Sequence, residues 1–235
     1  MRPLHEVLLE AAARPSVSHT SRRGVFALAA AAPIAFGLES VLAQTGAEQQ
    51  NRGRRNRGGR RKGDIAVLNY ALTLEHLEYA FYRDALEGPN AFTENAFNAF
   101  DDRDPQLFAR LQEIKQHEGA HVDALIATIQ QLGGKPVEEL CYDFGYSTVP
   151  QFLAVAQALE NTGVSAYDGA IADIKSPRLQ TTGATIATVE ARHAAYLNFI
   201  NGENPFPDAF DTPLDKADVL DIAGQFITGD QPCND

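Results

Sequence analysis

Sulfur-containing residues are scarce in this chain of 235 residues, which has two cysteines, Cys141 and Cys233, and one methionine, Met1. Two cysteines that form no CxxC pair are too few for a disulfide-rich scaffold. A methionine at the first position alone excludes a methionine ligand for haem inside the core. The apolar run from Val25 to Phe36 is about a dozen residues, whereas a membrane-spanning helix requires about 20. We therefore expect a globular domain with its own core and no transmembrane span.

Basic residues are scarce after residue 63. Residues 64–235 hold 9 lysines and arginines against 27 aspartates and glutamates, a net charge of −18, while the whole chain has a net charge of −11. An acidic surface of this kind repels the phosphates of nucleic acids. We therefore expect no nucleic-acid partner.

The first 43 residues have the pattern of an export signal. Ser21-Arg22-Arg23 precede the apolar run, and small residues around Ala43 provide a site for signal peptidase. The paired arginines resemble the twin-arginine signal, and an ordinary secretory signal is the alternative. The pattern predicts an exported protein of the periplasm or cell envelope.

Residues 44–63 contain seven lysines or arginines and almost no apolar side chain. A segment of this composition cannot bury enough apolar surface to fold, so we predict a disordered basic linker. It can serve as a solvated spacer or as a tether to an anionic cell envelope.

Four later stretches repeat apolar residues with the alternating spacing of three and four that is typical of helices in a bundle. Proline, glycine and helix-capping residues separate them, and no stretch of any length alternates as a strand does. The sequence predicts an all-α four-helix bundle with one long crossover and a short C-terminal helix. The expected helices span about residues 64–87, 105–132, 148–174 and 177–200, with the short helix after a capping box at 212–215.

Two connections and a tail complete the predicted domain, residues 64–235. The Phe-rich segment 90–103 is expected to cover one end of the bundle, and segment 135–147 to form the extended crossover. Cys141 lies in this crossover, and Cys233 lies near the C-terminus. In an oxidising compartment a disulfide between them would fix the tail, and two free thiols are the alternative.

The most informative motif is Glu-x-x-His, which occurs as Glu118 with His121 and again as Glu190 with His193. A Glu and a His three apart on a helix share one face, so both can reach the same metal ion. Each of the two other predicted helices carries a Glu followed seven residues later by a Tyr. The order along the chain is Glu75 with Tyr82, then the first motif, then Glu160 with Tyr167, then the second motif.

These four glutamates and two histidines lie on the apolar seams of the helices rather than on solvated faces. Burying an ionised carboxylate costs several kcal/mol unless it is paired or coordinated, and no lysine or arginine lies on the seams to pair with it. Two divalent cations would neutralise four carboxylates, with both imidazoles as neutral donors. Mixed carboxylate and imidazole ligands suit iron first, then manganese, with zinc also compatible. The sequence predicts a dinuclear metal site.

Several neighbouring side chains leave alternatives open. Glu78 is either a surface acid beside the seam or a further ligand, and Gly163 at its repeat position favours Glu75 as the ligand. Tyr82 and Tyr167 either hydrogen-bond to ligating carboxylates or simply pack in the core. His76 and His117 are expected beside the site or on the surface.

The pattern resembles the ferritin-like superfamily of dinuclear carboxylate proteins, and within it the exported proteins related to desiccation-associated proteins. The phrases LNYALTLEHLEYAFY, HEGAHVDAL, LENTGVSAYDGA, EARHAAYLNFING and NPFPDAFDTPL carry the resemblance over about residues 64–228. It implies Glu75 and Glu160 as terminal ligands, Glu118 and Glu190 as bridging ligands, and His121 and His193 as one nitrogen ligand for each metal.

Two kinds of function fit this pattern. The first is a redox-active di-iron or di-manganese site that handles O2, peroxide or Fe(II) in stress protection, as a ferroxidase, peroxidase or catalase would. The absence of a cysteine-rich rubredoxin module disfavours a peroxidase with its own electron donor. The second is a non-catalytic envelope protein in which the metal only stabilises the bundle. A homodimer is compatible with either, whereas a ferritin cage is disfavoured by the crossover, linker and tail.

Overall fold

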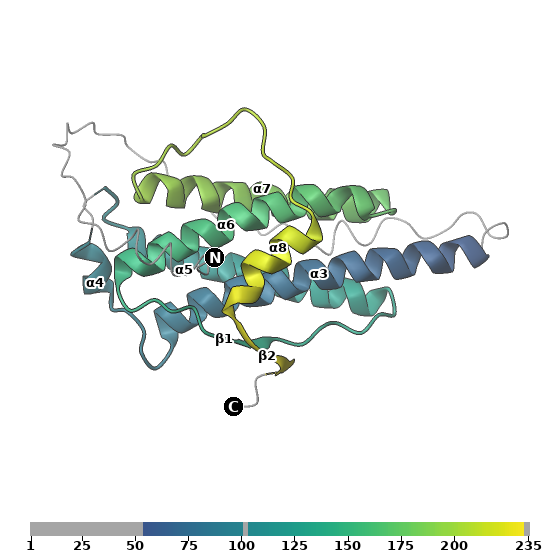
Figure 1. The fold of residues 1–235 in the computed structure, drawn as a ribbon, viewed down its shortest axis with the longest axis horizontal. Helices are drawn as coiled ribbons and strands as arrows, with labels where there is room; N and C mark the ends of the chain where they lie inside the picture. Colours follow the sequence, from purple (N-terminus) through teal and green to yellow (C-terminus); the bar gives the residue numbers. More distant parts are fainter. Residues whose placement is uncertain (1–53, 101–102, 233–235) are drawn as a thin grey trace.

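The computed structural model describes residues 54–100 and 103–232, and it confirms the all-α bundle. The four long helices are α3 (Arg54–Glu87), α5 (Leu107–Gln131), α6 (Val149–Ala170) and α7 (Pro177–Ile200). They run alongside one another through the length of the molecule (Figure 1). Helix α3 packs mainly against α5, and α6 packs mainly against α7. The bundle is therefore built from two helical hairpins, as the internal repeat indicated.

Short elements connect the helices and close the ends of the bundle. Helix α4 (Glu94–Asn98) lies in the Phe-rich connection, and the extended crossover contains strand β1 (Leu140–Tyr142). The crossover passes along one side of the bundle from the end of α5 to the start of α6 (Figure 1). The remaining elements are η1 (Ile171–Asp173), α8 (Lys216–Ala223), η2 (Gly224–Phe226) and β2 (Ile227–Pro232).

Capping residues set most of the helix boundaries where the sequence predicted them. The Thr148 hydroxyl accepts from the Gln151 amide at the start of α6, and Pro150 follows in the first turn. Gly133 and Gly202, with φ of 76° and 83°, follow the ends of α5 and α7. This left-handed conformation favours glycine and stops a helix. Helix α5 begins at Leu107, two residues later than expected.

Two predicted boundaries are wrong. Helix α3 begins at Arg54 rather than Asp64, so residues 54–63 of the predicted disordered linker are helical, while residues 44–53 lie outside the described part. Adding turns to an existing helix avoids the cost of nucleation, and residues 59–63 of this extension are exposed. At α8 the cap is Asp215, which accepts from the amides of Ala217 and Asp218, and not a capping box beginning at Thr212.

The apolar seams of the four helices form the core. One cluster of buried side chains fills the half of the bundle next to α4, and a second fills the opposite half. Phe97 from α4 is fully buried and packs edge-on against Phe152 of α6 with ring centres 5.8 Å apart. The Phe-rich connection therefore covers one end of the bundle, as predicted. The polar residues described below lie between these two apolar clusters.

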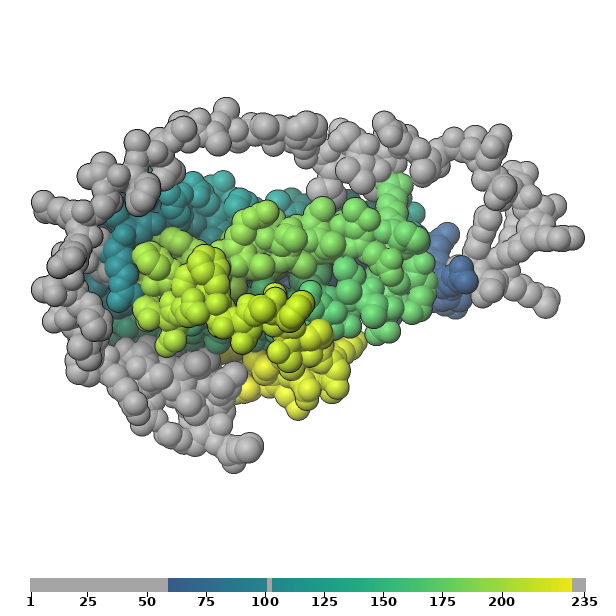
Figure 2. Space-filling view, turned by 90° about the horizontal axis from the view of Figure 1, so that it is seen from above, coloured from purple at the N-terminus to yellow at the C-terminus, as the bar shows by residue number. Residues whose placement is uncertain are grey.

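The C-terminal segment crosses the outside of the bundle. Helix α8 lies across α6, and β2 then pairs antiparallel with β1 in the crossover (Figure 1). Figure 2 shows the C-terminal segment, in yellow, on the surface beside the green part of the bundle. This two-stranded sheet was not predicted, because strands this short show no alternation of their own. Cys141 in β1 is disulfide-bonded, and its predicted partner Cys233 lies outside the described residues.

Two other predictions concern membranes and export. Among the described residues, no helix is both long enough and apolar enough to cross a bilayer. The predicted export signal, residues 1–43, lies outside the described part of the chain.

Candidate metal centre

Each long helix contributes one fully buried glutamate to the middle of the bundle. Glu75 comes from α3, Glu118 from α5, Glu160 from α6 and Glu190 from α7, and the exposed fraction of each is 0%. His121 and His193 follow one turn after Glu118 and Glu190 on the same helix faces. The structure therefore brings together all six residues that the sequence singled out as metal ligands.

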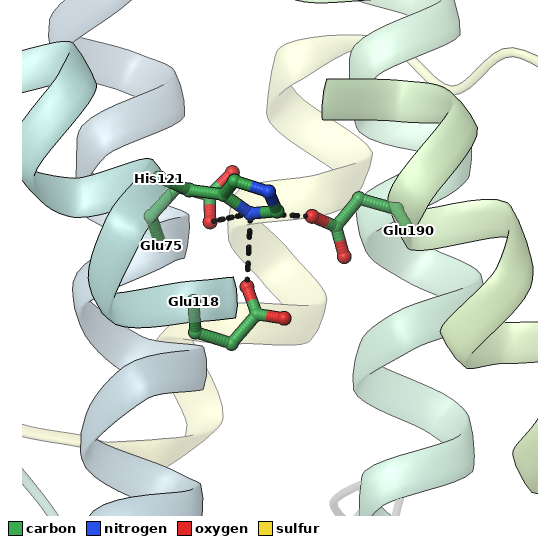
Figure 3. Close-up of side chains that lie close together, drawn as sticks. All are labelled: Glu75, Glu118, His121 and Glu190. Atoms are coloured by element: carbon green, nitrogen blue, oxygen red, sulfur yellow. Dashed lines mark hydrogen bonds and ion pairs between the residues drawn. The ribbon is translucent and has the colours of Figure 1, made fainter. Parts of the chain in front are cut away.

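His121 marks the first of two ligand groups. Its Nδ1 lies 2.9 Å from Oε1 of Glu190, 3.2 Å from Oε2 of Glu75 and 3.4 Å from Oε2 of Glu118 (Figure 3). One imidazole nitrogen can donate a hydrogen bond to only one of these oxygens. Three carboxylates that converge on one nitrogen, with these atoms all within 4.8 Å of one another, are arranged as ligands of a common cation.

His193 marks the second group in the same way. Its Nδ1 lies 3.0 Å from Oε1 of Glu118, 3.2 Å from Oε2 of Glu160 and 3.4 Å from Oε2 of Glu190. The two groups are related by the internal repeat, because Glu160 takes the place that Glu75 has in the first group.

Glu118 and Glu190 belong to both groups. Each turns one oxygen toward His121 and the other toward His193. All four of these oxygens are buried and accept no hydrogen bond among the described residues, because the one hydrogen that each ring nitrogen can donate goes to Glu75 or Glu160. Leaving one buried charged oxygen without a partner is costly, and bridging two cations would satisfy all four. The residues of this site therefore fit a pair of metal ions, because the ions would provide partners for these four oxygens.

The two tyrosines hydrogen-bond to the two glutamates that are not shared. The Tyr82 hydroxyl of α3 donates to Oε1 of Glu160 on α6 at 2.6 Å, and the Tyr167 hydroxyl of α6 donates to Oε1 of Glu75 on α3. Each bond leaves Oε2 of the glutamate facing its histidine. Of the two interpretations offered by the sequence, the hydrogen-bonding one is confirmed, and the bonds cross between the two hairpins. They orient the carboxylates as groups behind a metal ligand do.

Burial and mutual repulsion dominate the titration of the acids. Burial, then repulsion from Glu190, raises the pKa of Glu75 to about 8. Burial, then repulsion from Glu118, raises the pKa of Glu160 well above its usual range. Burial also acts to raise the pKa of Glu190, but the adjacent rings of His121 and His193 outweigh it and lower that pKa to about 2. Crowding therefore disfavours the ionised form of Glu75 and Glu160, and cations held between the carboxylates could offset this repulsion.

The two imidazoles respond in the opposite direction. Burial acts to lower the pKa of His193, but attraction to Glu160 and the other acids raises it to about 12. The same balance raises the pKa of His121 above its usual range. Divalent cations would replace these protons as the positive charge of the site.

No lysine or arginine side chain of the described residues pairs with the four glutamates. Lys115 is buried, but its ammonium group pairs with Glu87. Arg83 forms a two-pronged ion pair with Glu139 in the crossover, with nitrogen–oxygen distances of 3.1 and 2.9 Å. Lys115 and Arg83 therefore serve other contacts.

Glu78 is a fifth buried acid beside the site, which corrects its interpretation as a surface residue. Its exposed fraction is 4%, and it lies in neither ligand group. Burial, then repulsion from Glu190, raises its pKa well above the usual range. Gly163 provides the space that it occupies, because a Cβ atom at residue 163 would lie 2.9 Å from Oε1 of Glu78. Glu78 and Gly163, which occupy equivalent positions in the two halves of the repeat, therefore face each other across the bundle.

His117 and His76 occupy different surroundings. His117 is exposed on α5, yet its Nδ1 lies 2.9 Å from Nε2 of His193. His117, Glu118 and His121 also match the H-E-x-x-H order of zinc proteases, in which both histidines bind one metal. Here His117 lies outside both ligand groups, which argues against that arrangement. His76 is buried, and its Nε2 lies 3.3 Å from the Val137 carbonyl oxygen in the crossover.

Fold and site together define a four-helix carboxylate protein with a centre able to hold metal ions. The sequence model of the ferritin-like domain family matches residues 63–203, and the chain belongs to that family. The chain is also similar to protein rds1 of Schizosaccharomyces pombe, with 24% identity over 168 residues. That match covers 71% of this chain and 40% of the relative.

Proposed function

We propose that the chain binds two metal ions and uses them in redox chemistry. Glu118 and Glu190 would help to hold both ions, His121 and Glu75 would hold one of them, and His193 and Glu160 would hold the other. The four buried oxygens of Glu118 and Glu190, which accept no hydrogen bond from the part of the chain that the structure describes, carry this proposal. Two divalent ions neutralise the four carboxylates, so the buried site no longer costs the free energy of unpaired charge.

Iron is the first candidate metal, with manganese second and zinc third. Carboxylates and imidazoles together are the ligands that iron and manganese take in helical bundles. Two such ions would supply the two electrons that reduce peroxide to two water molecules, a change that takes up two protons. If the bound ions are Fe(II), O2 or peroxide would oxidise them, and the protein would act as a ferroxidase. The protein's role is then stress protection as a ferroxidase, peroxidase or catalase.

Glu78 favours a redox role over a purely structural one. Four carboxylates are enough to balance two divalent ions, so a structural site has no use for a fifth buried acid. Glu78 can hold a proton on its carboxyl group while the ions carry four positive charges, and it can release that proton as their charge rises. One of the two protons needed for peroxide reduction then comes from a group already inside the bundle.

A structural metal site is the second candidate. The observation that favours it is that the four glutamates come from four different helices, so a metal pair would cross-link the whole bundle. Metal binding would then contribute directly to the free energy of folding. This role predicts bound metal without turnover.

Anaerobic loading with Fe(II), followed by a pulse of peroxide or O2, separates the two candidates. The redox proposal predicts that both ions are oxidised rapidly and that one peroxide is consumed for every two Fe(II). The oxidation is measured by the change in absorbance. Glu78→Gln keeps the side-chain shape and the metal but removes the proton donor, so oxidation slows at least about tenfold. Loaded protein that stays in the Fe(II) state would support the structural role instead.

We also propose that the protein is exported to the periplasm or cell envelope. The sequence supports this through the paired arginines and apolar run within residues 1–43, and the basic helical start of α3 suits contact with an anionic envelope. Replacing Arg22 and Arg23 by lysine tests the route. Export that persists unchanged would exclude the twin-arginine signal.

A further inference from the structure

The two candidate ligand histidines, His121 and His193, differ in the hydrogen-bond partner of the Nε2 atom. Nε2 of His193, on the side of the ring away from the carboxylates, lies 2.9 Å from Nδ1 of His117. No atom of the described residues forms a hydrogen bond with Nε2 of His121, whose contacts are all made by Nδ1. In the repeat, the residue that corresponds to His117 is Val189, whose side chain has no hydrogen-bonding atom. The internal symmetry of the site is therefore broken at this position.

The contact between His117 and His193 has the geometry of a hydrogen bond. The two ring planes differ by 8°, and the ring centres lie 5.2 Å apart. That separation equals the distance between the two nitrogens plus one ring radius at each end, so the rings lie edge to edge in nearly one plane. The hydrogen therefore lies on the line that joins the rings, which is the favourable direction.

The carboxylates decide which nitrogen carries the hydrogen. Nδ1 of His193 faces Glu118, Glu160 and Glu190, so it must present its lone pair to a cation held by them. The hydrogen of neutral His193 is then on Nε2, and Nδ1 of His117 accepts it.

We propose that His117 is a positioning residue that makes the two metal positions unequal. It holds His193 in the tautomer and orientation that ligation requires, while His121 has no such support. The position formed by His193 therefore binds its ion more tightly and fills first. This inference rests on the proposed dinuclear site. Partners of this kind typically change metal affinity by about 10–100-fold.

Titration of the full chain with Co(II), after removal of bound metal, tests the inference. Wild type should bind two ions with clearly different affinities. His117→Leu should weaken the tighter position about 10–100-fold, so that the two affinities become similar. His117→Asn places an amide oxygen near the position of Nδ1 and should restore the difference. Gln116→Leu is the matched control, because it puts the same apolar residue on the exposed face of α5 without touching His193.

A second readout follows the hydrogen itself. In the Zn(II)-loaded protein, the Nε2–H signal of His193 should be visible by NMR and slow to exchange, and His117→Leu should make it exchange rapidly. If His117→Leu binds both ions with the affinities of the wild type, the proposed role of His117 is wrong, whereas the proposed dinuclear site still stands. A wild-type protein that binds no Co(II), Fe(II) or Mn(II) would overturn the proposed function as well.

Discussion

Replacing Glu75 by glutamine should make the metal-free protein more stable and the metal-loaded protein less stable. The substitution keeps the shape of the side chain and leaves an oxygen to accept the hydrogen bond from Tyr167, but it removes a buried charge. Without a bound cation, the buried charge of Glu75 lowers the stability of the folded protein. With a bound cation, the same carboxylate is a metal ligand and raises that stability. Few structural substitutions would change sign with metal in this way.

The magnitude follows from the pKa of Glu75, which burial raises from 4.5 to about 8. Between these values the folded protein holds a proton that the unfolded chain has released, so the stability of the metal-free wild type falls as the pH rises through this window. One proton is worth about 1.4 kcal/mol per pH unit, which sets a ceiling of about 5 kcal/mol at pH 8. Because Glu75 is coupled to His121 and Glu190, we expect a gain of about 3 kcal/mol from Glu75→Gln.

Thermal unfolding in the presence of a chelator measures this gain. For a domain of this size, about 3 kcal/mol corresponds to a rise in Tm of roughly 6–12 °C. The rise should be present at pH 8 and absent near pH 3, which lies below both the ordinary pKa of 4.5 and the raised pKa of about 8, so that Glu75 is protonated in the folded and in the unfolded state. Addition of Mn(II) at pH 8 should then raise the Tm of the wild type well above that of the variant. A gain that does not depend on pH, or no gain at all, would refute the reasoning.

Three further outcomes follow from the contacts around the site. Tyr82→Phe removes the hydrogen bond to Glu160 and should weaken metal binding about tenfold in a competition titration; unchanged affinity would reduce Tyr82 to a packing residue. Gly163→Ala brings a methyl group within 2.9 Å of Glu78, so Fe(II) oxidation should slow while the metal content stays the same, and wild-type kinetics would show that Glu78 has no part in the reaction. Reduction of the disulfide at Cys141 should release the C-terminal segment, so that the amides of β2 exchange hydrogen rapidly while the bundle stays folded. If these amides remain protected, the pairing of β2 with β1 is sufficient to hold the segment.

The long helices and the convergence of six candidate ligand residues could be predicted because two periodic patterns coincide. Apolar spacing identifies the buried face of each helix, and Glu75, Glu118 and their repeat partners fall on that face. A buried acid without a basic neighbour then indicates a cation. This reasoning needs no knowledge of how the helices are arranged in space, so the sequence alone could indicate which acids are buried.

Contacts between helices could not be predicted in the same way. Glu78 lies one position off the seam, and it is buried only because Gly163 on α6 leaves room for it. His117 lies on an exposed face, and its contact with His193 depends on how α5 and α7 are rotated against each other. The sequence did carry a signal for both, since each is a position at which the internal repeat is broken. The difference between Glu78 and Gly163 was used only to choose between two possible ligands, and the difference between His117 and Val189 would have marked His117 in the same way.

The number of metal ions bound to each chain tests the central claim most directly. We expect elemental analysis of the purified wild-type protein, loaded with Fe(II) or Mn(II), to give two ions for each chain. The double variant Glu118→Gln, Glu190→Gln should give none while its circular dichroism keeps the helical signal. A wild-type chain with less than one ion, or a double variant that retains both, would contradict the account.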